Sequence, residues 1–138
     1  MKKVLVFGTF DGLHKGHLDF FRQAKEHGDY LVVVVGRDST VLAVKKHLPK
    51  HNENKRLDAV LKAENVDYAR LGNEGDNRYA VIFEVNPDAI CLGYDQTHFT
   101  EKLEEKLKEM GLNIPVVRLK AYKPEIYKSS LLNEKSEK

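Results

Sequence analysis

The sequence of 138 residues predicts an α/β fold, with a five-stranded parallel sheet and helices on both faces. Two observations predict it. Short apolar runs alternate along the chain with segments whose apolar residues recur at helical spacing. The run from Tyr30 to Gly36 is almost entirely valine and leucine, which is typical of a parallel strand buried on both faces. We expect this strand to lie at the centre of the sheet, with right-handed crossovers between successive strands.

The first half of the chain is expected to form three strands and three helices. In order, these are the strand Lys3–Phe7, a helix ending at Gly28, the strand Tyr30–Gly36, a short helix through Lys46, a helix over about 55–64 and the strand Tyr68–Leu71. The helical spacing of Leu18, Phe21 and Ala24 supports the first helix. Asp38 or Ser39 can cap the second helix.

The second half is expected to alternate in the same way. In order, its elements are the helix Arg78–Val85, the strand Ala89–Leu92, the helix Thr100–Met110 and the strand Val116–Leu119. Tyr79, Ile82 and Phe83 are predicted to face inward from the first of these helices. By size, residues 1–132 form one domain, and residues 133–138 form a polar tail that we expect to be disordered.

Composition excludes several classes of partner. Lysine and arginine number 23 and acidic residues number 21, so no general excess of charge favours nucleic acid or an anionic membrane. The N-terminal apolar run Val4–Phe7 is far shorter than the ~20 residues of a membrane span. Cys91 is the single cysteine and lies in an apolar run, where a buried, inert thiol is the ordinary state. We therefore expect a cytoplasmic protein with no nucleic-acid or membrane partner.

The polar stretch Lys45–Lys55 has no apolar periodicity and contains Pro49. These features predict an exposed loop. Its length and charge make it the expected mobile part of the molecule, and we interpret it as a lid that closes over a bound ligand.

The stretch Gly8–His17 carries the strongest functional signal. It places His14 and His17 three residues apart, where a strand ends and a helix begins. A helix N-terminus leaves backbone N–H groups without intrahelical partners and favours anions. Residues three apart share one helical face, so both imidazoles can donate to the same anion, and Gly16 allows a ligand to approach the backbone. Ordinary surface histidines are the alternative, but they do not explain the whole pattern.

This stretch resembles the cytidylyltransferase-type nucleotidyltransferases, which carry a His-x-Gly-His turn on a Rossmann-like sheet. Four further segments stand in the order that this family shows: Gly28–Thr40, Lys55–Arg56, Leu71–Asp76 and Pro87–Gln96. Within the family, the chain is most similar to the small archaeal FAD synthases, over residues 1–132.

The resemblance implies transfer of a nucleotidyl group from a nucleoside triphosphate to a phosphorylated acceptor. The archaeal likeness favours AMP transfer from ATP to FMN, which gives FAD and pyrophosphate. The alternatives within the same family are glycerol-3-phosphate, pantetheine-phosphate and nicotinamide-mononucleotide transferases. Outside the enzymes, the alternative is a nucleotide-sensing binding module. A divalent ion, expected to be magnesium, would be held by substrate phosphates rather than by protein ligands. The family often forms homodimers.

The resemblance also implies roles for individual residues. The expected catalytic residues are His14, His17 and Lys46. The expected nucleotide-binding residues, besides the two histidines, are Thr9, Phe10, Lys15, Gly16, Asp95, Tyr122, Ser129 and Ser130. Asp11 and Arg56 are expected to bind the acceptor. The family usually carries an arginine before its late hydroxyl motif; here Tyr127–Leu131 lacks it, and Lys123 or Lys128 would have to supply the charge.

Overall fold

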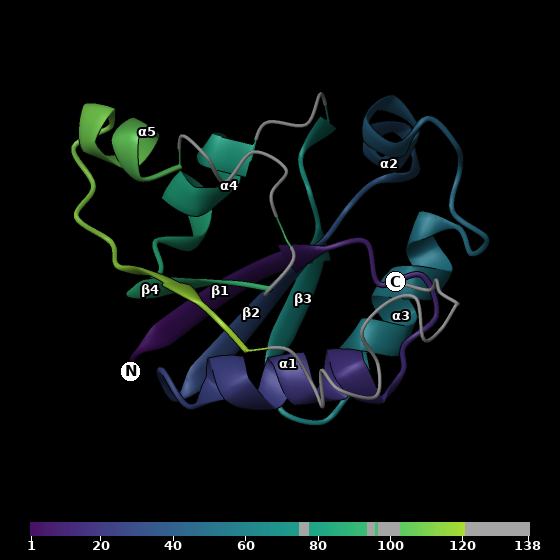
Figure 1. Ribbon diagram of the computed structural model, residues 1–138, viewed down its shortest axis with the longest axis horizontal. Coiled ribbons are helices and arrows are strands. Elements are labelled where there is room, and N and C mark those ends of the chain that lie inside the picture. The colour runs from purple at the N-terminus through teal and green to yellow at the C-terminus, as the bar shows by residue number, and fades with distance from the viewer. Residues whose placement is uncertain (75–77, 94–95, 97–102, 121–138) are drawn as a thin grey trace.

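The structure, a computed structural model, describes residues 1–74, 78–93, 96 and 103–120. Within these residues, parallel strands form one five-stranded sheet in the order β3-β2-β1-β4-β5 (Figure 1). The strands are β1 (Lys3–Gly8), β2 (Tyr30–Val35), β3 (Tyr68–Leu71), β4 (Ala89–Leu92) and β5 (Val116–Arg118). The predicted α/β fold with a parallel sheet is confirmed.

One prediction about the sheet is wrong. β1 lies at the centre, and β2 lies one place away, between β1 and β3. Both strands are buried along most of their length. A continuous apolar run reports burial on both faces, which every interior strand of a parallel sheet has, and it carries no information about strand order.

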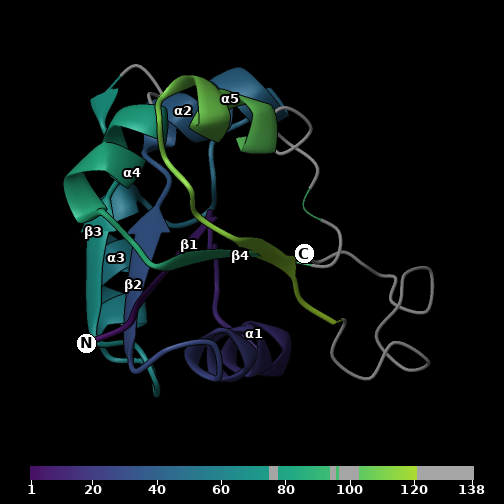
Figure 2. The same ribbon diagram turned by 90° about the vertical axis from the view of Figure 1, so that its left-hand side faces the viewer.

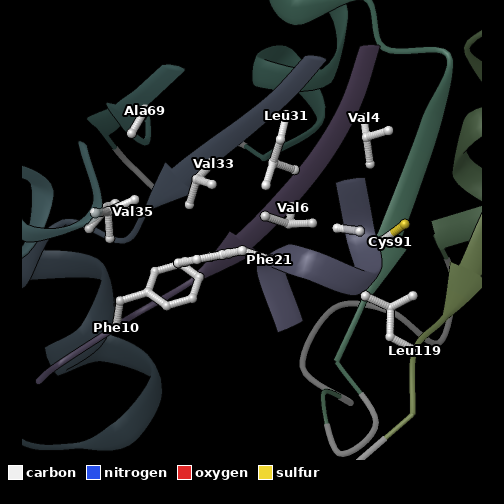
Figure 3. Packing of buried hydrophobic residues seen from close by; sticks show 12 residues of the cluster. Val4, Val6, Phe10, Phe21, Leu31, Val33, Val35, Ala69, Cys91 and Leu119 are labelled. Carbon is white, nitrogen blue, oxygen red and sulfur yellow. The ribbon is translucent and has the colours of Figure 1, made fainter. Parts of the chain in front are cut away.

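Helices cover both faces of this sheet (Figure 2). They are α1 (Lys15–Lys25), α2 (Asp38–Lys45), α3 (Glu53–Leu61), α4 (Arg78–Val85) and α5 (Leu103–Glu109). Side chains alternate along each strand, so Val4 and Val6 of β1 pack with α1 and α3, and Leu5 and Phe7 pack with α4 and α5. We call these two clusters the α1 core and the α4 core; Figure 3 shows the α1 core. No described helix is long and apolar enough to span a bilayer.

The helix faces differ from the prediction at a few positions. Phe21 and Ala24 are buried as expected, but Leu18 is half exposed at the start of α1. Phe83, predicted to face inward, is 57% exposed, because α4 buries a neighbouring stripe formed by Val81, Ile82 and Val85. Arg37, not Asp38 or Ser39, occupies the N-cap of α2 and makes no capping bond itself, whereas the Glu53 carboxylate accepts from the Asp38 N–H over 2.7 Å. Residues 100–102 of the expected fifth helix lie outside the described residues.

Cys91 is fully buried in the α1 core, and desolvation raises the pKa of its thiol to about 11. The thiol therefore stays almost entirely protonated at pH 8, where an exposed thiol with a pKa of about 8.5 is partly ionised. We expect iodoacetamide at pH 8 to label native Cys91 at least about 10²-fold more slowly than the urea-unfolded chain. Mass spectrometry of quenched samples measures the two rates. Equal labelling rates would show that this part of the core opens readily.

Candidate functional site at the carboxyl ends of the strands

The carboxyl ends of three neighbouring strands meet at one edge of the sheet. Gly8 is paired with Val35, and Val35 is paired with Leu71. The ladder continues into the loops, where the Gly36 N–H donates to the Gly8 carbonyl over 2.9 Å. The strands that follow β1 in sequence, β2 and β3, lie on one side of it, whereas β4 and β5 lie on the other side. The strand order therefore reverses beside β1, which makes this edge a topological switch point. The segment that leaves β1 there is Gly8–His17, which we call the histidine turn.

His14 and His17 cap α1 with their own side chains. His14 is the N-cap residue in an extended conformation, and its Nδ1 accepts a hydrogen bond from the Gly16 N–H over 3.0 Å. In return, the His17 Nδ1 accepts one from the His14 N–H over 3.3 Å. Two backbone donors that the helix itself leaves unpaired are thus satisfied reciprocally, as in a capping box.

This cap fixes the chemical form of both rings. A nitrogen that accepts from a backbone N–H carries no proton, so each neutral imidazole holds its proton on Nε2. The rings are stacked, with centroids 4.0 Å apart and planes at 26°. The first turn of α1 has no acidic residue. Two neighbouring imidazole N–H donors at a helix N-terminus are suited to bind an anion.

Gly16 has a role here that the sequence did not reveal. A Cβ added at Gly16 would lie 2.8 Å from the Cε1 of His14 and 3.1 Å from its Nδ1. Any larger residue would therefore push the capping imidazole away from the helix. The expectation that a ligand approaches the backbone at this glycine stays a prediction.

Phe10 anchors the turn in the α1 core. Its backbone has φ 55°, a left-handed conformation that is unfavourable for an aromatic residue, while its side chain is only 5% exposed. The ring lies over Gly8, where a Cβ would come within 2.5 Å of it, and it meets the His17 ring edge-on at 5.4 Å. Figure 3 shows Phe10 beside Phe21, with the two centroids 5.3 Å apart. The ring of Phe10 therefore packs beneath the histidines, and its backbone is the part that can face a ligand.

Asp11 joins the histidine turn to the loop between α2 and α3. Its Oδ2 accepts from the Lys50 N–H over 2.7 Å, and its Oδ1 accepts from both the N–H and the Nδ1 of His51 over 3.0 and 2.8 Å. Partial burial alone would raise the pKa of Asp11, but these hydrogen bonds outweigh it and hold the pKa below its ordinary value. The structure thus gives the Asp11 carboxylate partners within the protein, whereas we expected it to bind the acceptor.

The lowered pKa of Asp11 predicts a pH-dependent contribution to stability. Because the folded-state pKa is depressed, the contribution is present above the unfolded value of about 4 and is lost as the pH falls from there through the folded pKa. Asp11→Asn should lower the free energy of unfolding by about 1 kcal/mol at pH 7, and by less at pH 3.5. Urea titrations at both pH values measure the difference. A loss of the same size at both would contradict this linkage.

The two basic residues expected at the site lie in different surroundings. Lys46 is exposed at the end of α2, with φ 68° and its N–H bonded to the Leu42 carbonyl. Arg56 on α3 is buried, and its guanidinium bonds to groups inside the protein. The structure therefore leaves Lys46 accessible to a ligand but does not bring Arg56 to the surface where we expected it to meet the acceptor.

Gln96 and Arg118 form a set of contacts that sequence reasoning missed. The Gln96 carboxamide accepts from the Gly93 N–H over 3.0 Å and donates to the Phe7 carbonyl over 3.1 Å, which links the ends of β4 and β1. Arg118 at the end of β5 donates to the Gly93 carbonyl over 2.7 Å and to the Gln96 carbonyl. Only the position of Gln96 just after a strand hinted at this role.

Several expected site residues lie outside the described residues. They are Asp95, Tyr122, Ser129 and Ser130, together with Lys123, Tyr127 and Lys128 of the late motif and the tail 133–138. Their roles stay predictions.

Comparison with known proteins places these observations in a family. A family model described as cytidylyltransferase-like matches residues 5–135. A FAD synthase of Thermoplasma volcanium is 42% identical over 135 residues, which are 98% of this chain and 94% of that protein. A FAD synthase of Archaeoglobus profundus is 47% identical over 124 residues, 88% of this chain and 76% of that protein.

Solved structures share the fold. A protein of Thermoplasma volcanium, described as a lipopolysaccharide core biosynthesis protein, superposes with a TM-score of 0.83 at 41% identity, over 88% of this chain and 98% of that one. Pantoate-beta-alanine ligase of Francisella tularensis superposes with a TM-score of 0.63 at 15% identity, over 86% of this chain and 58% of that one. At 15% identity, the second likeness concerns the fold alone.

Proposed function

The chain belongs to the cytidylyltransferase-like family, and on that premise we propose that it is an FMN adenylyltransferase, which transfers AMP from ATP to FMN and releases FAD and pyrophosphate. The likeness to FAD synthases over 98% of the chain supports FMN as acceptor. The observation that supports the chemistry is the reciprocal cap of His14 and His17, which keeps the Nδ1 of each ring as an acceptor and leaves the proton on Nε2 at the start of α1.

The reaction is an in-line attack of the FMN phosphate on the α-phosphorus of ATP. Negative charge builds on the non-bridging oxygens of the α-phosphate and on the departing pyrophosphate. In our proposal, His14 and His17 donate to these oxygens, and the backbone of Thr9 and Phe10 together with the N–H groups at the start of α1 holds the triphosphate. No covalent nucleophile is needed, because positioned donors and alignment supply the rate.

Two positive charges complete the proposed site. Lys46 is exposed at the end of α2 and Lys15 is exposed in the first turn of α1, and in our proposal both neutralise the triphosphate. Within the described residues, no three His, Cys, Asp or Glu side chains gather as a metal site. We therefore propose that magnesium enters with ATP, held by its phosphates, and that the ion when bound neutralises the leaving pyrophosphate.

The test is a side-by-side assay of acceptors and nucleotides. Purified protein is given ATP or CTP with FMN, glycerol 3-phosphate, phosphopantetheine or nicotinamide mononucleotide, and pyrophosphate release is followed. We expect the highest kcat/KM for ATP with FMN, with FAD identified by chromatography. A higher value for CTP with glycerol 3-phosphate would overturn the flavin assignment and keep nucleotidyl transfer. Binding of ATP without turnover of any acceptor would favour a sensing module.

Movement of the loop that carries Lys46 is part of the proposal. The segment 46–52 is mostly exposed, and Asp11 holds its later residues Lys50 and His51. We therefore expect closure on ATP to involve its earlier residues, around Lys46 and Leu48, the latter 60% exposed. Trypsin should cut within 45–55 in the free protein, and ATP with magnesium should slow this cleavage at least about fivefold. Equal cleavage rates at saturating nucleotide would argue against closure.

Two further properties belong to the same proposal. A single thiol that is buried suits a reducing cytoplasm, where we place the reaction. We also propose a homodimer on the strength of the family resemblance, and light scattering on the eluted protein would measure its mass.

A further inference from the structure

Arg56 is the one polar or charged side chain that is buried among the residues the structure describes, and it is 1% exposed. A guanidinium removed from water requires partners for its donors and for its charge. Arg56 has both. It makes four hydrogen bonds of 2.7–2.9 Å, three to backbone carbonyls and one to the carboxylate of Asp38.

The four acceptors belong to three segments at the edge of the sheet where the site lies: the turn after β1, the β2–α2 connection and the loop before α3. Nη1 donates to the carbonyls of Thr9, after β1, and Gly36, after β2, over 2.8 Å each. Nε donates to the His51 carbonyl in the loop over 2.9 Å, and Nη2 donates to Asp38 Oδ1 at the start of α2 over 2.7 Å. One side chain from α3 thus ties the histidine turn to the loop that carries Lys46.

A second contact joins the same two segments. Asp11 of the turn accepts from Lys50 and His51 of the loop, so turn and loop are joined from the interior by Arg56 and nearer the surface by Asp11. For Arg56 to touch an acceptor phosphate, its guanidinium would have to break its four hydrogen bonds and leave the interior of the protein. The contacts therefore argue for support of the site from beneath.

We propose that Arg56 is a positioning residue for nucleotidyl transfer: it holds the Thr9 end of the histidine turn and the loop that carries Lys46 in fixed register, without contact to the acceptor. This inference rests on the proposed function for its kinetic test, and it has a structural test of its own. A lysine at this position keeps the charge but cannot make the forked bonds to Thr9, Gly36 and Asp38 together.

The kinetic test compares Arg56→Lys with Lys55→Met, its exposed neighbour on α3, as a matched control. We expect Arg56→Lys to lower kcat by about 10²-fold while the KM for FMN changes by less than about threefold. Combined with His17→Ala, the loss should be much smaller than the product of the single losses, because both changes act on the same aligned donors. Two results would overturn the proposal in favour of direct acceptor contact. They are a KM for FMN that rises about tenfold or more in Arg56→Lys with kcat retained, and a double variant whose loss equals the product of the two single losses.

The structural test is hydrogen exchange, followed by mass spectrometry on the unliganded protein. In Arg56→Lys, segments 9–14 and 46–52 should exchange faster together, with no such change in Lys55→Met. If Arg56→Lys does not fold, Asp38→Asn, which keeps Arg56 and removes its counter-charge, should show the same paired increase. Unchanged exchange in either segment would overturn the proposal. A wild-type protein that forms no FAD would instead refute the proposed function and leave the exchange result standing.

Discussion

His14→Ala and His17→Ala are each expected to lower kcat for FAD formation by about 10²-fold or more, with a smaller effect on KM. Each substitution removes an Nε2–H donor at the start of α1. Charge develops on the phosphate oxygens mainly in the transition state, so the loss falls mainly on kcat. Steady-state assays over a range of ATP and FMN concentrations measure both constants. Near-normal kcat in both variants would refute the proposed roles.

Each alanine variant also removes a helix cap, so one further variant, His14→Asn, separates the two effects. Asn is a good N-cap residue and can place its side-chain oxygen near the Nδ1 position of His14, but it has no atom at the Nε2 position. We therefore expect His14→Asn to keep most of the stability, while His14→Ala loses about 1 kcal/mol, and both to lose activity alike. Activity that follows stability across the two variants would mean that the histidine serves the helix alone.

Phe10→Ala is expected to lower the free energy of unfolding by about 3–5 kcal/mol, the cost of deleting a buried aromatic side chain and leaving a cavity. Phe10 packs against Phe21 and Gly8 in the α1 core, so little nearby can fill the space. The turn should also lose its anchor beneath His17, so kcat should fall even where the variant is folded. Urea unfolding and kinetics well below the midpoint measure the two effects.

Phe83→Ala is the matched control for this substitution. It removes the same atoms from a side chain that is 57% exposed on α4, on the other face of the sheet. We expect a change within about 0.5 kcal/mol and unchanged kinetics. A loss of stability at Phe83 as large as that at Phe10 would mean that an unseen contact buries this ring. A small loss at Phe10 would mean that the core closes over the gap.

The sequence predicted the features that depend on neighbouring residues. The strands Tyr68–Leu71 and Ala89–Leu92 and the helix Arg78–Val85 have the predicted bounds, and His14 and His17 lie at the start of a helix. Local patterns suffice for these features, because periodicity and capping act within a few residues.

Features that depend on long-range packing were not predictable in the same way. Arg56 meets Asp38 and Thr9 across 18 and 47 residues, and no local pattern distinguishes a buried arginine from one on a solvated helix face. Asp11 likewise finds His51 across 40 residues. The backbone of Phe10 is left-handed and its ring is buried, and no local pattern in the sequence predicts either feature.

The shared duty of His14 and His17 limits how this site can be altered. In many enzymes, a change in the site that weakens catalysis strengthens the fold, so activity and stability can be traded. Imidazole is the one side chain that carries an acceptor nitrogen and a donor nitrogen in a rigid ring, and here Nδ1 caps α1 while Nε2 carries the proton. A replacement that keeps one function loses the other. Efforts to stabilise this protein should therefore leave these two positions alone and begin elsewhere.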